Sequence, residues 1–193
     1  MAYLEGKNLV ASYGVVPILH ECSVEVEKGE LAVIVGPNGA GKSTVMRVLL
    51  GMLEATSGSV KFDGKDISTL TTQERINHGL AFVPQTKNVF PSMTVEENLQ
   101  MGGFIRQDDI NQTIEEVYAL FPILYEKRKQ LAEQLSGGQR QQVAFGRAMM
   151  TKPSIMLLDE PTAGVSPIVM DEIFSNILDV RNAGMAVLMV EQN

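Results

Sequence analysis

Runs of apolar residues alternate with short polar or glycine-rich segments through the first 85 residues, which is the pattern of strands joined by turns and short helices. The uninterrupted apolar run at 31–35 predicts a strand of the kind buried in a parallel sheet, and the run at 80–83 predicts a further strand that Pro84 closes. Strands with mixed apolar and polar residues are predicted over residues 4–10, 18–26 and 60–62. A helix is predicted from Ser43 until Gly51 stops it, since most residues between them are apolar.

The middle third of the chain, from about residue 86 to 134, changes to a helical pattern. Thr94 followed three residues later by Glu97 is the signature of a capping box at a helix start. Apolar residues then recur at helical spacing from Ile114 to Phe121, until Pro122 ends the run. We therefore expect a helical insertion between two α/β segments.

The last third returns to alternating strands and helices. The pattern predicts, in order, a helix from near Ser136, a strand over 155–158, a helix spanning 169–180 and a strand over 186–190. Strands that alternate with helices around an apolar core predict an α/β fold with a parallel sheet.

Composition narrows the class of protein. A chain of 193 residues suits one domain, and its net charge of −7 argues against a general nucleic-acid binder, so no nucleic-acid partner is expected. Neither a signal peptide nor an apolar run near the roughly 20 residues of a membrane span is present. The single cysteine, Cys22, excludes an internal disulfide. These features predict an intracellular, soluble domain.

The strongest chemical signal is the string G-P-N-G-A-G-K-S-T at residues 36–44, directly after the apolar strand. It is a complete phosphate-binding loop, in which glycines let backbone N–H groups approach phosphate oxygens. In this motif Lys42 reaches the β- and γ-phosphates, Ser43 offers a hydroxyl to Mg²⁺, and the helix N-terminus faces the anion. The residues predicted to bind a nucleoside triphosphate here are Gly36, Asn38, Gly39, Ala40, Gly41, Lys42, Ser43 and Thr44.

The strand over 155–158 ends in two acids, Asp159 and Glu160. Ligands of open α/β sheets bind beyond the carboxyl ends of strands. Asp159 is predicted on the metal side, acting through coordinated water or Ser43, and Glu160 as the general base. An acidic turn after a strand is common, and the phosphate-binding loop upstream is what gives this one meaning.

A second glycine-rich string, L-S-G-G-Q at 135–139, opens the helix before the acidic strand. Ser136 is the expected N-cap, and the two glycines expose backbone N–H groups to an anion. Such a string is also typical of a flexible helix cap without a ligand. Its position just upstream of the acidic strand favours the anion-binding interpretation.

The three strings, in this order, resemble the nucleotide-binding subunit of ATP-binding cassette (ABC) transporters, and the resemblance covers the whole chain. It implies a P-loop NTPase core with an ABC-type antiparallel β portion and a helical insertion. It also implies one nucleotide-binding domain, with a core of about 1–85 and 135–193 and a helical subdomain of about 86–134. Such subunits normally continue with more strands and a C-terminal helical part, so that part is expected to be missing here.

The resemblance further implies a head-to-tail dimer of two ATPase protomers, either identical or different. ATP would lie between the phosphate-binding loop of one protomer and Ser136, Gly138 and Gln139 of the other.

Four other positions gain roles from the resemblance. Tyr13 matches the aromatic residue that stacks on adenine, and Gln85 matches the glutamine that senses Mg²⁺ and the attacking water. Gln192 stands where most ABC ATPases have a catalytic histidine, and Ser166 stands where most have an aspartate. The amide of Gln192 still donates to a γ-phosphate oxygen but does not titrate near neutrality. We interpret Gln192 as a variant of this lineage at the histidine position.

The strings at 89–99 and 190–193 are most similar to ATPase subunits of branched-chain amino-acid importers. The resemblance implies ATP and Mg²⁺ as cofactors, polytopic permease subunits docked on the helical subdomain, and a solute-binding protein as an indirect partner. It implies a peripheral location at the cytoplasmic face of the inner or plasma membrane. Alternatives are an ATPase for urea, amide or lipopolysaccharide transport, a soluble ABC interaction module, or a cassette that binds ATP without cleaving it.

Overall fold

The computed structural model describes residues 2–192, which form two four-stranded sheets and a group of helices. The strands are β1 (Leu4–Tyr13), β2 (Val16–Val26), β3 (Leu31–Val35), β4 (Ser57–Phe62), β5 (Lys65–Asp66), β6 (Leu80–Val83), β7 (Ile155–Asp159) and β8 (Ala186–Glu191). The helices are α1 (Lys42–Leu49), α2 (Thr72–Asn77), α3 (Val95–Gly102), α4 (Asn111–Leu120), α5 (Pro122–Glu126), the 3₁₀ turn η1 (Ala132–Gln134), α6 (Gly137–Met149) and α7 (Pro167–Asn182).

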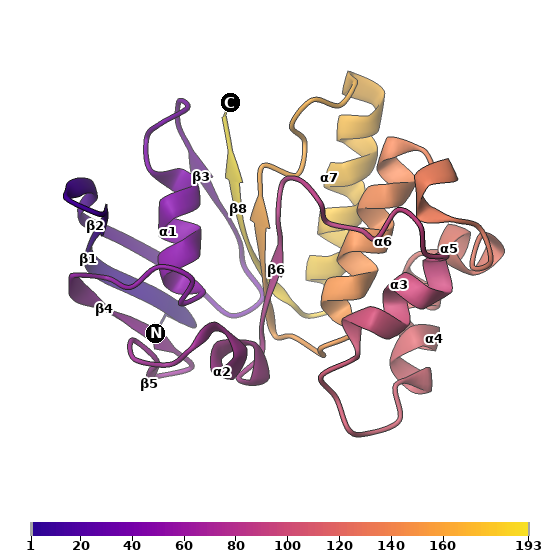
Figure 1. The fold of residues 1–193 in the computed structure, drawn as a ribbon, viewed down its shortest axis with the longest axis horizontal. Helices are drawn as coiled ribbons and strands as arrows, with labels where there is room; N and C mark the ends of the chain where they lie inside the picture. Colours follow the sequence, from indigo (N-terminus) through magenta and orange to yellow (C-terminus); the bar gives the residue numbers. More distant parts are fainter. Residues whose placement is uncertain (1, 193) are drawn as a thin grey trace.

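One sheet is antiparallel, in the order β2-β1-β4-β5, and the other is parallel, in the order β3-β8-β7-β6. The parallel sheet stands in the middle of the molecule, with α1 and the antiparallel sheet on one side and α3 to α7 on the other (Figure 1). Parallel neighbours require crossover connections, which explains why strands distant in sequence pair. This arrangement is the predicted α/β core with an antiparallel portion.

The parallel sheet separates two hydrophobic cores. Along β7, Met156 and Leu158 pack into the core with the helices α3 to α7, whereas Ile155 and Leu157 pack into the core with α1 and the antiparallel sheet. This division follows from the period of two that alternates side chains across a strand. Both faces of β7 are therefore apolar, as its uninterrupted run of hydrophobic residues predicts.

Several local predictions are confirmed. The strands at 31–35 and 80–83 have the predicted bounds, and the segment between β6 and α6 is helical. Thr94 caps α3 in a reciprocal capping box with Glu97. Pro122 does more than end α4, because it also occupies the first turn of α5.

The prediction that residues 31–35 form a fully buried strand is wrong. Val33 is 44% exposed and Val35 is 59% exposed. The reason is that β3 lies at the edge of the parallel sheet, where Ala32 and Ile34 pack against a core and the opposite face of the strand is only partly covered.

Helix α2 and strand β5 lie in a stretch for which the apolar pattern predicts no element. Arg75 is the buried residue of α2, and its guanidinium donates hydrogen bonds to four backbone carbonyls, including those of Val48 and Leu49 at 2.8 Å each. A helix anchored by a buried arginine carries no apolar periodicity. Its readable signal is the capping box of Thr71 and Glu74.

Within residues 2–192, no helix combines the length and the apolar character that crossing a membrane requires.

Candidate nucleotide site

A cavity of about 490 Å³ opens at the carboxyl ends of the parallel strands. It is lined by Tyr13, Ile18, Asn38, Gly39, Gly41, Lys42, Ser43, Thr44, Gln85, Glu160 and Gln192. All four parallel strands contribute to it, since the phosphate-binding loop follows β3, Gln85 follows β6, Glu160 follows β7 and Gln192 follows β8. The site thus forms where an open α/β sheet gathers ligand-binding loops, and its volume suits a nucleotide-sized ligand.

The phosphate-binding loop ends at Gly41, which is the N-cap of α1. Its φ of 89° lies in the left-handed region, and no side chain caps the helix. A β-carbon at this position would lie 3.1 Å from the Leu19 side chain. No side-chain acceptor therefore competes with an anion for the backbone N–H groups of this helix end.

Lys42 is 6% exposed and folds back over its own loop. Its ammonium donates to the carbonyl oxygens of Gly36 at 2.7 Å and Pro37 at 3.0 Å, and it lies 3.6 Å from Glu160 Oε1. The charge is thus held at the mouth of the loop by two neutral acceptors and one carboxylate.

Ser43 lines the cavity, and its hydroxyl donates to Asp159 Oδ1 at 2.9 Å. Asp159 itself lines an adjoining pocket that shares Tyr13 and Gln85 with this cavity. Among residues 2–192 no group of three or more His, Cys, Asp or Glu side chains could hold a metal ion. One hydroxyl and one carboxylate instead fit a hard cation that takes its remaining ligands from phosphate and water. This pair, at the boundary between the cavity and the adjoining pocket, could hold Mg²⁺.

Glu160 lies at the centre of the polar groups and is only 9% exposed. Its Oε2 accepts hydrogen bonds from the amide of Gln85 at 3.0 Å and from the amide of Gln192 at 2.8 Å. Its backbone φ is 45°, an uncommon conformation for a residue with a side chain. Two of the predicted catalytic residues, Gln85 and Gln192, therefore both contact the carboxylate of the third, Glu160.

Tyr13 is 45% exposed at the end of β1, on the rim of the cavity. Its hydroxyl accepts a hydrogen bond from Arg47 at 3.3 Å. An exposed ring on the rim is available for stacking on a planar ligand. Ala40 and Gly36 belong to the same loop but do not line the cavity.

Ser136, Gly138 and Gln139 do not line the cavity either. Ser136 caps α6, because its hydroxyl accepts from the Gln139 N–H at 3.2 Å and the Gln139 side chain accepts from the Ser136 N–H at the same distance. The predicted cap is confirmed. Within one chain, however, the structure does not bring this helix end to the phosphate-binding loop.

Two residues that sequence reasoning missed, Glu191 and Thr162, connect the site to the loop that follows Glu160. Both are buried, and Glu191 Oε1 accepts from the Thr162 hydroxyl at 2.7 Å and from its N–H at 3.2 Å. The contact fixes the start of this loop to the end of β8, next to Gln192. Each residue adjoins a predicted site string, which was the available signal, but a separation of 29 positions in the sequence conceals their contact.

Comparisons with known proteins agree on one family. A family model described as ABC transporter matches residues 19–163. A branched-chain amino acid transport ATP-binding protein of Pseudomonas aeruginosa, BraG, is 44% identical over 94% of this chain and 78% of its own length. The lipopolysaccharide export ATP-binding protein LptB of Haemophilus influenzae is 36% identical over 100% of this chain and 81% of its own length.

A solved structure described as a nucleotide-free ATP-binding cassette from an ABC transporter has a TM-score of 0.90 and 31% identity. It aligns over 100% of this chain and 82% of its own. The cavity at the sheet edge, the phosphate-binding loop and the capped L-S-G-G-Q helix are thus found on the fold of known cassettes. The chain belongs to the ABC transporter family, as one of its ATP-hydrolysing cassettes.

Proposed function

We propose that this chain is the ATPase subunit of an importer for branched-chain amino acids, working as a dimer on membrane permease subunits. The observation that carries the hydrolytic role is the convergence of Lys42, Gln85 and Gln192 on the Glu160 carboxylate. The substrate class is supported by the 44% identity to BraG and by a LivF protein of Archaeoglobus fulgidus at 37%. The LptB relatives support the alternative of lipopolysaccharide export less strongly.

Nucleotide binding begins with the loop and with α1. The backbone N–H groups after Gly39 and Gly41 contact the phosphates, and the Lys42 ammonium exchanges the carbonyls of Gly36 and Pro37 for phosphate oxygens. Ser43 and Asp159 are the residues that would hold the metal ion. Mg²⁺, when bound, neutralises charge on the β- and γ-phosphates.

Hydrolysis requires a base beside the γ-phosphate, and Glu160 takes that role. Its carboxylate accepts a proton from the attacking water, whose oxygen forms the new bond to phosphorus as the bond to the bridging oxygen breaks. Gln85 and Gln192 fix the carboxylate in the resting enzyme. Since both are donors, they can also turn to the water or to a γ-phosphate oxygen.

The second half of the site comes from a partner protomer. Ser136, Gly138 and Gln139 sit on a helix N-terminus suited to an anion, yet they lie outside the cavity of their own chain. A head-to-tail dimer supplies them in trans.

The membrane subunits dock on a groove next to Gln85. This groove, of about 310 Å³, is lined mainly by β6, α3 and α6, with Phe82, Met101, Ile105 and Arg147 among its residues. Because Pro84 and Lys87 line it on both sides of Gln85, an occupant can shift the amide that contacts Glu160. Docking there places the chain peripherally at the cytoplasmic face of the membrane.

Glu160→Gln tests the hydrolytic role. Removal of the base should reduce steady-state phosphate release by about 10²- to 10⁴-fold, whereas ATP still binds and the closed dimer accumulates. Glu133→Gln, in the 3₁₀ turn, is the matched control and should hydrolyse ATP normally. Undiminished hydrolysis by Glu160→Gln rules out the assigned base.

Copurification from native membranes tests the transport role. Recovery of a polytopic subunit supports it, and the solute bound by the associated receptor identifies the substrate. A chain that hydrolyses ATP but copurifies only with soluble proteins would be an interaction module instead.

A further inference from the structure

A second cavity, beside the helices, lies away from the nucleotide site and has no part in the proposed mechanism. It has a volume of about 570 Å³ and lies between α4, the end of α6, the loop into β7 and the turn from α7 into β8. That position is at the amino ends of β7 and β8, the edge of the sheet opposite to the nucleotide. Its volume is within the range of small-molecule sites.

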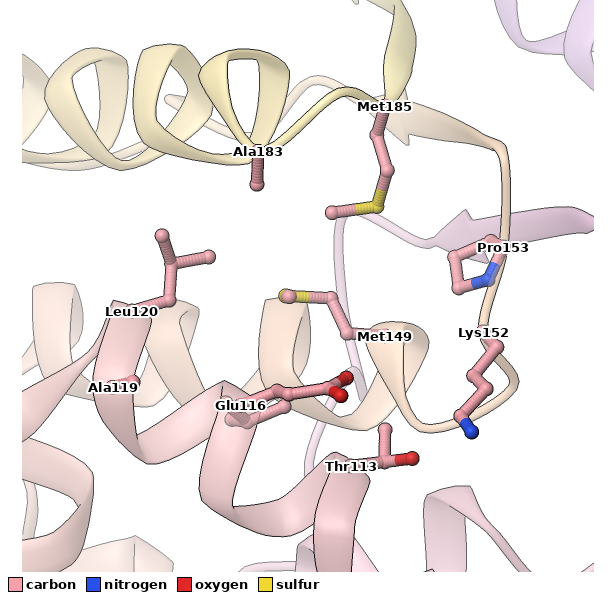
Figure 2. Close-up of a pocket in the computed structure, with 10 residues that line it drawn as sticks. Thr113, Glu116, Ala119, Leu120, Met149, Lys152, Pro153, Ala183 and Met185 are labelled. Carbon is pink, nitrogen blue, oxygen red and sulfur yellow. The ribbon is translucent and has the colours of Figure 1, made fainter.

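The cavity has an apolar part and a polar end (Figure 2). Leu120, Ala183, Met149 and Met185 surround the apolar part. Thr113, Glu116 and Lys152 lie together at the other end. Methionine side chains adapt to the shape of a guest, so this lining suits a branched or irregular apolar group.

The two charges at the polar end are weakly satisfied by the protein. Asp108, the acid beside Lys152, is already bound by Arg106 through bonds of 2.8 Å and 2.6 Å, and its distance to the Lys152 ammonium is 4.0 Å. The strong pair with Arg106 holds the pKa of Asp108 at about 2. Lys152 therefore keeps donors for another anion.

Glu116 supplies the opposite charge to Lys152 at the polar end of the cavity. Its carboxylate accepts one hydrogen bond, from Gln112 at 3.0 Å, and forms no ion pair within residues 2–192. One end of the cavity thus presents an acceptor carboxylate and a donor ammonium, with apolar surface behind them.

We propose that this cavity binds a zwitterion with an apolar side chain, either a free amino acid or a short apolar peptide. The α-ammonium pairs with Glu116, the α-carboxylate pairs with Lys152, and the apolar group lies between Leu120, Met149 and Met185. A fatty acid offers no cation to Glu116, and a nucleotide would place phosphates beside that same carboxylate, where like charges repel. A zwitterion pairs with both side chains.

The location gives such a ligand a means to alter ATP hydrolysis. Thr113, Glu116 and Leu120 are on α4, in the helical insertion, whereas Met185 directly precedes β8, the strand that ends next to Gln192. A ligand held between them restrains the insertion relative to the core. This inference is independent of the transported solute, because ligand binding is measured on the purified chain.

The test titrates the folded protein with L-leucine and with the dipeptide Leu-Leu by calorimetry. Three partial ligands accompany them: glycine without the apolar group, 4-methylpentanoate without the ammonium, and isopentylamine without the carboxylate. At least one zwitterion should bind, and each partial ligand should bind about tenfold more weakly or worse. Tighter binding of leucine identifies a free amino acid, and tighter binding of Leu-Leu identifies a peptide.

The variants Glu116→Gln and Lys152→Gln lie outside the nucleotide site and are exposed, so they should fold and hydrolyse ATP normally without ligand. Each should weaken the zwitterion about fivefold to tenfold, with Glu133→Gln and Lys61→Gln as charge-matched controls. The proposal is wrong if neither zwitterion binds at millimolar concentration. It is equally wrong if the two cavity variants bind like their controls or if isopentylamine binds as well as leucine.

Discussion

Helix α1 begins at the end of one glycine-rich string and α6 begins within another, yet the two N-termini are capped differently. Gly41 starts α1 with a left-handed backbone and no side-chain cap, so its first N–H groups are open to an anion. Ser136 starts α6 with a reciprocal capping box, so part of its hydrogen-bonding capacity is already used by Gln139.

The difference indicates an order of events. The end of α1 is a site that one chain provides alone, and it can bind nucleotide before any partner arrives. The end of α6 is capped within its own chain. The Ser136 hydroxyl accepts the cap bond from Gln139 and still has a hydrogen to donate, so in the proposed dimer it can contact a phosphate of the partner protomer while the cap bond remains. The first two variants below test this distinction, and the third tests the loop that follows Glu160; they run from the largest expected effect to the smallest.

Lys42→Gln removes the charge at the α1 site. The amide keeps hydrogen-bonding capacity but carries no charge, so ATP binding by the isolated chain should weaken on the order of 100-fold. Equilibrium binding of a fluorescent ATP analogue measures the effect, and Lys61→Gln on β4 is the control. ATP affinity within threefold of the unchanged protein would show that α1 does not form the primary site.

Ser136→Ala removes the cap of α6 and one proposed phosphate ligand. Thr94→Ala is its matched control, because Thr94 caps α3 with the same capping box. Each variant should lose about 1 kcal/mol of unfolding free energy. Only Ser136→Ala should also lower kcat, about tenfold, with ATP binding by the isolated chain unchanged. Equal kcat values for the two variants would reduce Ser136 to a structural cap.

Thr162→Val tests whether the loop after Glu160 must be fixed to β8. Without the hydroxyl, the buried Glu191 carboxylate keeps only the weaker N–H bond at 3.2 Å. We expect kcat to fall about threefold with little change in KM, and Thr162→Ser to restore it, because serine keeps the donor. Thermal unfolding of both variants separates this effect from loss of fold. Failure of serine to restore kcat would contradict a role for the hydrogen bond.

Much of the fold could be predicted from local pattern, because β3, β6, α3 and α6 each carry a complete signal in consecutive residues. The apolar pattern gave a wrong prediction of burial where burial depends on which strands and helices lie beside the element. Val33 and Val35 are apolar but exposed because β3 lies at a sheet edge, and nothing within the strand reveals its place in the order.

The candidate site likewise has a part that local sequence predicts and a part that it does not. Residues 36–44 form a contiguous motif, and the structure places Lys42 and Ser43 in the cavity as predicted. The hydrogen bonds of Gln85 and Gln192 to a single oxygen of Glu160 could not be predicted, because they join three segments that meet only through strand order. Family resemblance selected these residues, whereas local pattern did not.

The backbone at Glu160 has a consequence for protein engineering. A residue with a side chain at a φ of 45° carries conformational strain of order 1 kcal/mol or more, and glycine or asparagine adopts this conformation at less cost. Because Glu160 is the proposed base, selection for heat resistance alone should favour substitutions at this position that sharply reduce turnover. Stabilised descendants of this cassette need an activity screen at every round, since improvement at this position trades one property directly for the other.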